Sequence, residues 1–370
     1  RRGNPVLLSR KLFAAALALP LGACDAIVLD PAGDVARQQA DLVVMSTILM
    51  LVIIVPVMLL TVFFAWKYRQ SNTSARYEPE WSHSTQLELV IWAAPLLIII
   101  CLGALTWVGT HLLDPYRPVS RLDKDRAIAP SVKPLEVNVV ALDWKWLFIY
   151  PEQGVATVNE LVVPTGRPVN FRITASSVMN SFYVPALAGQ IYAMPGMETK
   201  LHAVLNRPGD FKGFSANYSG AGFSNMRFDF RGVSDAQFAQ WVGKVKGGQD
   251  GQLDRTAYMK LEKPSEKEPV RHYAGVAGDL FDAIVNMCVQ PGKMCMSDMM
   301  AIDARGGLGL AGVHNVAMLT YDKHGREGFV PAASDRSVDA SYVRALCSGL
   351  EPGKVRSSGI HAPSDLAPLS

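Results

Sequence analysis

The densest group of residues that could do chemistry is a run of cysteine and methionine near the C-terminal end. It lies between residues 287 and 300 and contains Cys288, Met294, Cys295, Met296, Met299 and Met300. Thiolate and thioether sulfur are soft donors that suit Cu(I), so this run could bind copper. The alternative in an oxidising compartment is a disulfide between Cys288 and Cys295, which would leave Cys347 unpaired.

A single carboxylate, Glu88, stands at the start of a long apolar run. A carboxylate at the water edge of an apolar path can gather protons. The alternative is a first-turn glutamate favoured by the helix dipole. No phosphate loop, nucleotide fingerprint or hydrolase triad stands out.

Residues 214–226 (FSANYSGAGFSNM) have the layout of a copper-binding loop at the end of a β-domain, yet they contain neither cysteine nor histidine. No cysteine occurs between Cys101 and Cys288. Copper that cycles between Cu(I) and Cu(II) needs strongly donating thiolates and imidazoles, and a lone methionine is only a weak axial ligand. The loop therefore predicts no metal.

Two long uncharged runs predict membrane spans. Residues 42–66 and 89–110 contain 25 and 22 residues without a charge, enough to cross a hydrocarbon core of about 30 Å. Pro56 and Pro95 lie inside them and are tolerated in membrane helices. The short loop between the runs carries Lys67, Arg69 and Arg76, which predicts the cytoplasmic side for this loop.

The N-terminal residues predict export. Basic residues precede the short apolar run 12–21, as in a secretory signal, here residues 1–23. The sequence at residues 21–24 (LGAC) is similar to a bacterial lipobox, in which Cys24 would take a lipid and become the mature N-terminus. The alternative is an ordinary cleavage site. Residues 24–40 and everything after His111 would then face the periplasm.

Beyond the second span the apolar pattern changes to alternation, as in residues 135–139, 169–173, 201–205 and 226–230. These strands, separated by turn clusters, predict a two-sheet sandwich over residues 114–232, after a membrane hairpin over residues 41–113. Helical spacing follows a capping box at Ser234 and continues in patches at 255–261 and 279–289, which predicts a helical appendage over residues 233–290. Residues 291–370 read as a variable tail, partly disordered, with one possible strand at 316–321.

Composition excludes one class of partner. The chain has 370 residues, 49% of them hydrophobic and 19% charged, with a net charge of +3. A balance this close to neutral gives no argument for nucleic acid.

A membrane hairpin followed by an exported sandwich resembles subunit II of the haem-copper respiratory oxidases. Residues 143–152 (DWKWLFIYPE), 178–185 (VMNSFYVP) and 190–197 (QIYAMPGM) resemble the cytochrome o (bo-type) ubiquinol oxidase branch. The resemblance runs from the lipobox to about Pro291. It implies two transmembrane helices, an all-β cupredoxin-like Greek-key sandwich and a small, aromatic-rich, helical C-terminal region.

In the copper-containing branch of this family, the sandwich holds a binuclear copper centre with histidine, cysteine and methionine ligands. The resemblance places those ligand positions at Asn180, Tyr218, Gly222, Met226 and Asp229, and a glutamate position at Gly220. It therefore implies no copper in this chain, no soluble cytochrome c as donor, and a membrane ubiquinol in its place. The haems and one copper, and the catalytic residues, would belong to subunit I of a proton-pumping enzyme that reduces oxygen to water.

The resemblance also implies roles for three further residues. Glu88 would lie at the entrance of a proton pathway into subunit I. Trp144 and Trp146 flank Lys145 and are expected on one side of a strand, packing against subunit I. The implied partners are subunits I, III and IV and membrane lipids, at the bacterial inner membrane with the large domain in the periplasm. Two rival hypotheses are a copper-containing cytochrome c oxidase subunit and a free-standing lipoprotein that handles copper.

Overall fold

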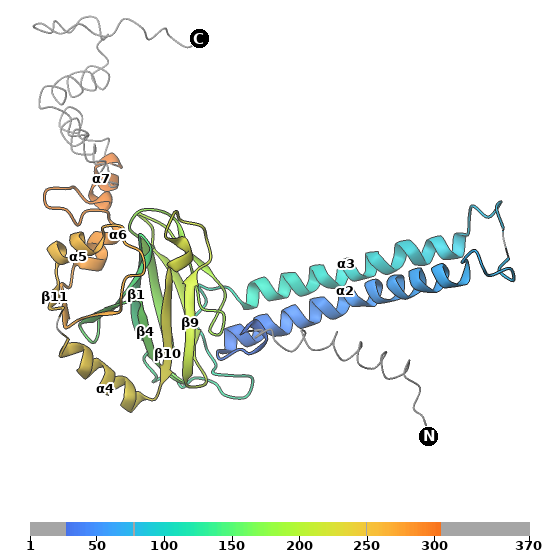
Figure 1. Ribbon diagram of the computed structural model, residues 1–370. Helices are drawn as coiled ribbons and strands as arrows, with labels where there is room; N and C mark the ends of the chain where they lie inside the picture. The colour runs from blue at the N-terminus through green and yellow to red at the C-terminus, as the bar shows by residue number, and fades with distance from the viewer. Residues whose placement is uncertain (1–26, 77, 249, 305–370) are drawn as a thin grey trace, which may run out of the picture.

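The structure is a computed structural model that describes residues 27–76, 78–248 and 250–304 (Figure 1). The predicted signal, Cys24, Cys347 and the possible strand at 316–321 lie outside the described residues.

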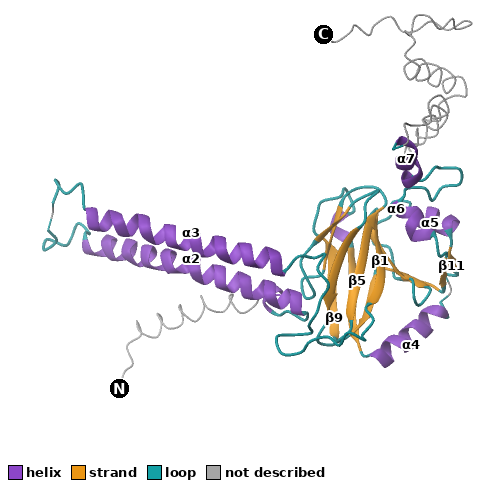
Figure 2. Ribbon diagram, turned by 180° about the vertical axis from the view of Figure 1, so that it is seen from behind, coloured by secondary structure: helices purple, strands orange, loops and turns teal. Residues whose placement is uncertain are grey.

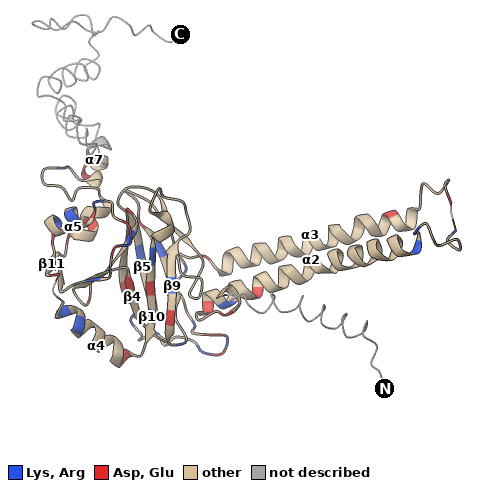
Figure 3. Cartoon of the chain, in the orientation of Figure 1, with Lys and Arg blue, Asp and Glu red and all other residues tan. Residues whose placement is uncertain are grey.

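Two long helices form the predicted hairpin. Helix α2 (Asp34–Lys67) and helix α3 (Thr85–Leu112) run side by side and project from the sandwich (Figure 2). Both are long and apolar enough to cross a membrane, and the charged side chains gather at the ends of the hairpin (Figure 3). Their exposed apolar surface would be unfavourable in water and fits a lipid environment. Both helices continue through their prolines, Pro56 and Pro95.

Helix α2 begins before the uncharged run, because its first turns pack on the sandwich. Asp34, Ala36 and Ala40 are buried there. The backbone N–H groups of Ala32 and Gly33 donate to the Ala186 carbonyl at 2.8 and 3.0 Å. A Cβ atom at Gly33 would lie 2.6 Å from the carbonyl oxygens of Leu187 and Val204, so this close approach requires glycine.

The sandwich consists of two sheets, which confirms the predicted fold class. The first has the order β12-β3-β2-β1-β5-β8 and the second the order β4-β10-β9-β6-β7. Strand β1 pairs in parallel with β5, and β4 pairs in parallel with β10, while the other pairs in these two sheets are antiparallel. The strands are β1 (Leu135–Leu142), β2 (Lys145–Tyr150), β3 (Val155–Val158), β4 (Glu160–Pro164), β5 (Pro168–Ala175), β6 (Asn180–Tyr183), β7 (Ile191–Ala193), β8 (Thr199–Val204), β9 (Gly209–Ser215), β10 (Arg227–Val233) and β12 (Arg271–Tyr273).

Aromatic rings fill the space between the two sheets. Phe182 and Phe228 stack with their centroids 5.5 Å apart, and Trp146 meets both rings edge-on. Such pairs add to the stability gained from burial. This core accounts for the alternating apolar positions of the strands.

The C-terminal part covers the outer face of the first sheet, except for its first helix, which packs against Tyr150 of the core between the sheets. It contains α4 (Asp235–Lys246), β11 (Gln252–Leu253), α5 (Arg255–Leu261), β13 (Gly275–Val276), α6 (Leu280–Val285) and α7 (Met296–Asp303). The predicted capping box at Ser234 is present. A second apolar core joins Leu147 and Ile149 of β2 to Tyr258 and Leu280. Both faces of β2 are therefore buried, and strand β12 joins the sandwich sheet itself, which the helical reading of this region did not predict.

Candidate functional site

The predicted copper-type loop connects β9 to β10 and contains a short 3-10 helix, η3 (Phe223–Asn225). Asn180 is buried beside it. The Ser215 hydroxyl donates to Asn180 Oδ1 at 3.1 Å, and the Ser215 backbone N–H donates to the Met226 carbonyl at 3.1 Å. Two of the five ligand positions of the copper-containing branch, Asn180 and Met226, thus lie together. Their side chains are a neutral amide and a buried thioether.

The indole of Trp144 lies over this loop. Its Nε1 donates to the Ser219 carbonyl at 3.0 Å. A Cβ atom at Gly222 would lie 2.5 Å from the ring atom Cδ2, and one at Gly220 would lie 3.1 Å from Cζ2. The ring therefore occupies the space that side chains at these two positions would need.

The two remaining ligand positions, Tyr218 and Asp229, lie away from the group formed by Asn180, Gly222 and Met226. Tyr218 is largely exposed and packs its ring edge-on against Phe223 at 5.6 Å. Asp229 lies on the outward face of β10, where it forms an ion pair with Lys212. Among the residues that the structure describes, no group of three or more histidine, cysteine, aspartate or glutamate side chains could hold a metal.

The fold gives the two tryptophans different surroundings, which corrects one prediction. Trp144 lies in the turn between β1 and β2 with a left-handed φ of 66°, so strand alternation begins only at Lys145. Trp146 is completely buried in the sandwich core. The prediction that Trp146 packs against a partner subunit is therefore wrong, whereas the partly buried ring of Trp144 packs against the edge of the same core.

Comparisons with known proteins agree with this architecture. The family model for the periplasmic domain of cytochrome c oxidase subunit II matches residues 135–233, and the model for the COX aromatic rich motif matches residues 249–292. The cytochrome bo(3) ubiquinol oxidase subunit 2 of Pseudomonas putida is 53% identical over 268 residues, which is 72% of this chain and 82% of that protein. The chain belongs to subunit II of the bo-type ubiquinol oxidases.

Two further comparisons concern this subunit II. The ubiquinol oxidase subunit 2 of Acetobacter aceti is 50% identical over 72% of this chain and 84% of that protein. The periplasmic domain of subunit II of cytochrome oxidase (CoxB) of Bradyrhizobium japonicum is 25% identical and covers 32% of this chain and 98% of that one, with a TM-score of 0.30. On the identity to the two subunit 2 sequences and the two apolar helices, the chain is an oxidase subunit of a respiratory terminal oxidase complex and a membrane protein.

In this subunit II, Glu88 lies in the first turn of α3. Helix α3 begins at the end of the hairpin remote from the sandwich (Figure 1). Its Oε1 lies 2.6 Å from His83 Nδ1, and its backbone N–H donates to the Ser84 carbonyl at 2.9 Å. The side chain is 50% exposed. The carboxylate is therefore exposed to solvent at the N-terminal end of an apolar helix.

The sulfur cluster contains the disulfide between Cys288 and Cys295, as one of the two alternatives predicted. Disulfide sulfur is not the thiolate that copper requires. The flanking residues Met287 and Met296 pack beside Gly196 of the 190–197 motif. The bridge closes a loop within the C-terminal region, and the two methionines pack this loop against the sandwich.

Sequence reasoning missed the most connected buried carboxylate, that of Glu160. Its Oε2 accepts hydrogen bonds from Trp241 Nε1 at 3.0 Å and lies 2.7 Å from His272 Nε2, and its Oε1 pairs with Arg231. These partners come from α4, β12 and β10. A glutamate that opens an otherwise apolar strand, ELVVP, is the sequence signal that could have revealed it.

A second missed residue is Lys145, whose side chain is buried. Its Nζ donates to the Lys263 carbonyl at 2.8 Å and to the Ser265 hydroxyl at 2.6 Å. Burial lowers the pKa of Lys145, against the opposing charges of Glu268 and Asp143. This lysine fixes the segment 263–272, called the strap below, across the β1–β2 turn that carries Trp144.

Proposed function

We propose that this chain is the exported cap and membrane anchor of an enzyme that oxidises ubiquinol, reduces oxygen to water and pumps protons. Subunit I would hold the haems and the single copper, and this chain would hold no binuclear copper centre and no catalytic residue. The observation that carries the proposal is the loop between β9 and β10. Where the copper-containing relatives supply ligands, this loop offers a glycine and a buried thioether, and the neighbouring strand β6 offers only the amide of Asn180.

The residues present do not fit a binuclear copper centre. Such a centre needs bridging thiolates and imidazoles, and the loop has none. The Trp144 ring also leaves no room for a side chain at Gly222. Without this relay, electrons from a soluble cytochrome have no entry in this chain, so a quinol dissolved in the membrane is the donor that the proposal names.

Glu88 is proposed as the collecting carboxylate at the cytoplasmic entrance of a proton pathway into subunit I. Its half-exposed side chain at the end of an apolar helix supports this role. The neighbouring His83 ring lies 2.6 Å away and orients the carboxylate.

The test of the electron donor is purification of the intact complex through a tag on this chain. We expect haem spectra, rapid oxygen consumption with ubiquinol, and none with reduced cytochrome c. Metal analysis should give one copper per complex. Two additional coppers that are lost in a Met226→Ala variant, together with activity on cytochrome c, would contradict the proposal.

The proposed complex also contains subunits III and IV, with this chain anchored by a lipid at Cys24 and its large domain in the periplasm. Metabolic labelling with radioactive palmitate should label the wild-type chain and not a Cys24→Ser variant. Equal labelling of the two proteins would contradict lipidation at this residue.

A further inference from the structure

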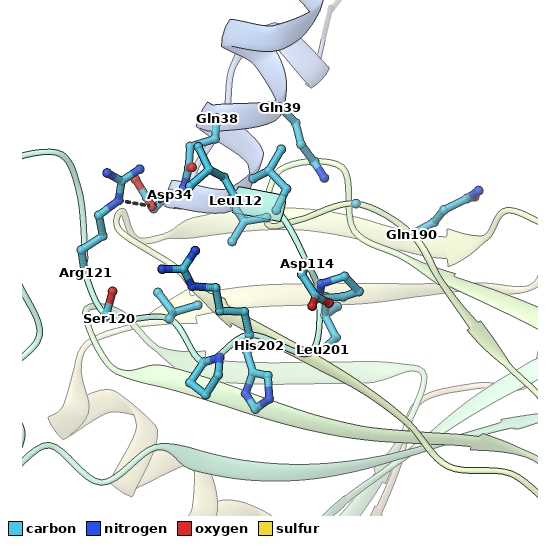
Figure 4. A pocket seen from close by; sticks show the side chains of 17 residues that line it. Asp34, Gln38, Gln39, Leu112, Asp114, Ser120, Arg121, Gln190, Leu201 and His202 are labelled. Carbon is cyan, nitrogen blue, oxygen red and sulfur yellow. Dashed lines mark hydrogen bonds and ion pairs between the residues drawn. The ribbon is translucent and has the colours of Figure 1, made fainter. Parts of the chain in front are cut away.

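A polar cavity of about 230 Å³ lies where the two helices meet the sandwich. Its wall comes from the first turns of α2, from the segment that leaves α3, and from strand β8. Asp34 and Arg121 lie on one side, Asp114 lies on another, and His202 lies toward the sandwich (Figure 4). With the loop residues Gly189 and Gln190, four separate parts of the chain therefore build this cavity.

An apolar groove of about 520 Å³ lies between α2 and α3 and adjoins the cavity. Residues 113–115 line both spaces. The groove is lined by Leu42, Val43 and Ser46 on α2 and by Leu105, Thr106 and Gly109 on α3. A polar cavity thus opens into an apolar channel along the helices.

The two spaces lie at different depths of a bilayer. The groove lies within the uncharged runs that predict the membrane spans. Gln38, which lines the cavity, precedes Leu42 by four residues, which is about 6 Å of helix. The headgroup layer on each side of the hydrocarbon core is about 5–8 Å thick. The cavity therefore lies at headgroup depth, and the groove lies at the depth of the acyl chains.

The charges of the cavity are balanced. Arg117 and Arg121 oppose Asp34 and Asp114. Arg121 Nε donates to Asp34 Oδ2 at 3.0 Å, whereas the buried Asp34 Oδ1 has no hydrogen-bond partner among the described residues. Burial lowers the pKa of His202, so this ring adds no charge near neutral pH. A balanced lining matches a zwitterion better than a net anion.

We propose that this junction binds one membrane phospholipid with a zwitterionic amine headgroup. Its phosphate lies against Arg117 and the outer edge of Arg121, because guanidinium groups bind phosphate oxygens strongly. Its ammonium faces Asp114, and one acyl chain lies in the groove between α2 and α3. The lipid then fills the space between the hairpin and the sandwich.

The test uses the assembled oxidase in nanodiscs that contain phosphatidylethanolamine with a photoactivatable diazirine in its acyl chain. After illumination, the modified peptides are mapped by mass spectrometry. We expect adducts within residues 42–46 and 105–110. Arg117→Gln should lower their yield about tenfold, the effect of losing one charge-assisted hydrogen bond. The control Arg37→Gln removes an exposed charge on α2 that does not line the cavity, and the adduct yield of this variant should be unchanged.

A second variant, Ser46→Phe, fills the groove and should abolish the adducts whatever the headgroup. The haem spectrum and subunit composition confirm that each variant assembles. Adducts only at other residues, or an equal yield in Arg117→Gln, would overturn the site. So would subunit I side chains filling the groove in a structure of the complex. An equally reactive phosphatidylglycerol analogue would overturn the headgroup assignment. These readouts do not depend on whether ubiquinol is the electron donor.

Discussion

The indole ring of Trp144 lies against Gly222, so close that a Cβ atom on this glycine would come within 2.5 Å of the ring. The ring is held there by its hydrogen bond to the Ser219 carbonyl and by the left-handed turn that carries it. This packing joins the β1–β2 turn to the loop between β9 and β10. The loop keeps a defined shape without a metal.

The first prediction concerns this packing. Gly222→Ala should lower the stability of the chain by about 1–3 kcal/mol, the usual cost of overpacking. Trp144→Ala in the same chain should recover part of this loss, because the clash is then removed. Thermal unfolding of the full chain in detergent measures both effects. The control Gly243→Ala lies in α4 with open space around it, and it should be neutral or stabilising. Equal losses in both glycine variants would contradict the packing argument.

The second prediction concerns Glu160. Glu160→Ala removes the common partner of Trp241, His272 and Arg231 and should cost about 3 kcal/mol, since it leaves buried groups without partners. The loss should be concentrated at the contact between the C-terminal region and the sandwich. Limited proteolysis of the full chain should therefore show faster cleavage after residue 233. The exposed Glu266→Gln is the matched control and should leave the cleavage rate unchanged.

The third prediction concerns pH and the strap. Burial raises the pKa of Glu268, but hydrogen bonds from Ser265 and Arg271 and the charges of Arg271 and Lys145 outweigh it and leave the pKa lowered. A carboxyl whose folded pKa is lowered contributes stability above its unfolded pKa, about 4.3, and loses it as pH falls through the folded pKa. Hydrogen exchange of residues 263–272 should therefore show less protection below about pH 4. Glu268→Gln should remove this pH dependence, and a variant that kept it would refute the assignment.

The fourth prediction concerns Glu88. In the assembled enzyme, Glu88→Ala should lower turnover and proton uptake severalfold, because the collecting carboxylate is lost. Stopped-flow proton uptake and oxygen consumption measure the two quantities. The control is Glu78→Ala, which removes an exposed acid from the loop between α2 and α3. If Glu88→Ala turned over and took up protons at the wild-type rate, the carboxylate would have only a structural role.

The fifth prediction concerns the disulfide. It closes a short loop with a sequence separation of 7, so replacing both Cys288 and Cys295 by serine should cost about 2–3 kcal/mol. In reductant, the unfolding temperature of the wild type should fall to about that of the double variant. The unfolding temperature of the double variant should not change in reductant. Cys101→Ser, at the free cysteine of α3, is the control. A reductant-dependent shift in the double variant would point to another bridge.

Local signals in the sequence were sufficient for most of the fold. The uncharged runs, the alternation around Phe171 and the capping box at Ser234 each depend on neighbours in sequence, and each element is present. The disulfide between Cys288 and Cys295 was one of two open alternatives because spacing alone does not distinguish a bridge from a ligand pair.

The differences arise where long-range packing determines the outcome. The predicted contact of Trp146 with a partner was wrong because its ring fills the core between two sheets that meet only in the folded chain. No pattern signals the left-handed turn at Trp144 either. The partners of Glu160 come from segments 71–112 residues away in sequence, so no local pattern could reveal them. Strand β12 has only three residues, which are too few to show the apolar–polar alternation of a strand.

The junction at Gly33 has a mechanical consequence. Residues 32–36 supply backbone hydrogen bonds to the sandwich and also begin α2, so no flexible linker separates the two bodies. A helix is stiff along its length, and α2 of 34 residues is about 50 Å long. A tilt of the hairpin therefore tilts the exported domain by the same angle, and the hairpin and the domain move as one rigid body.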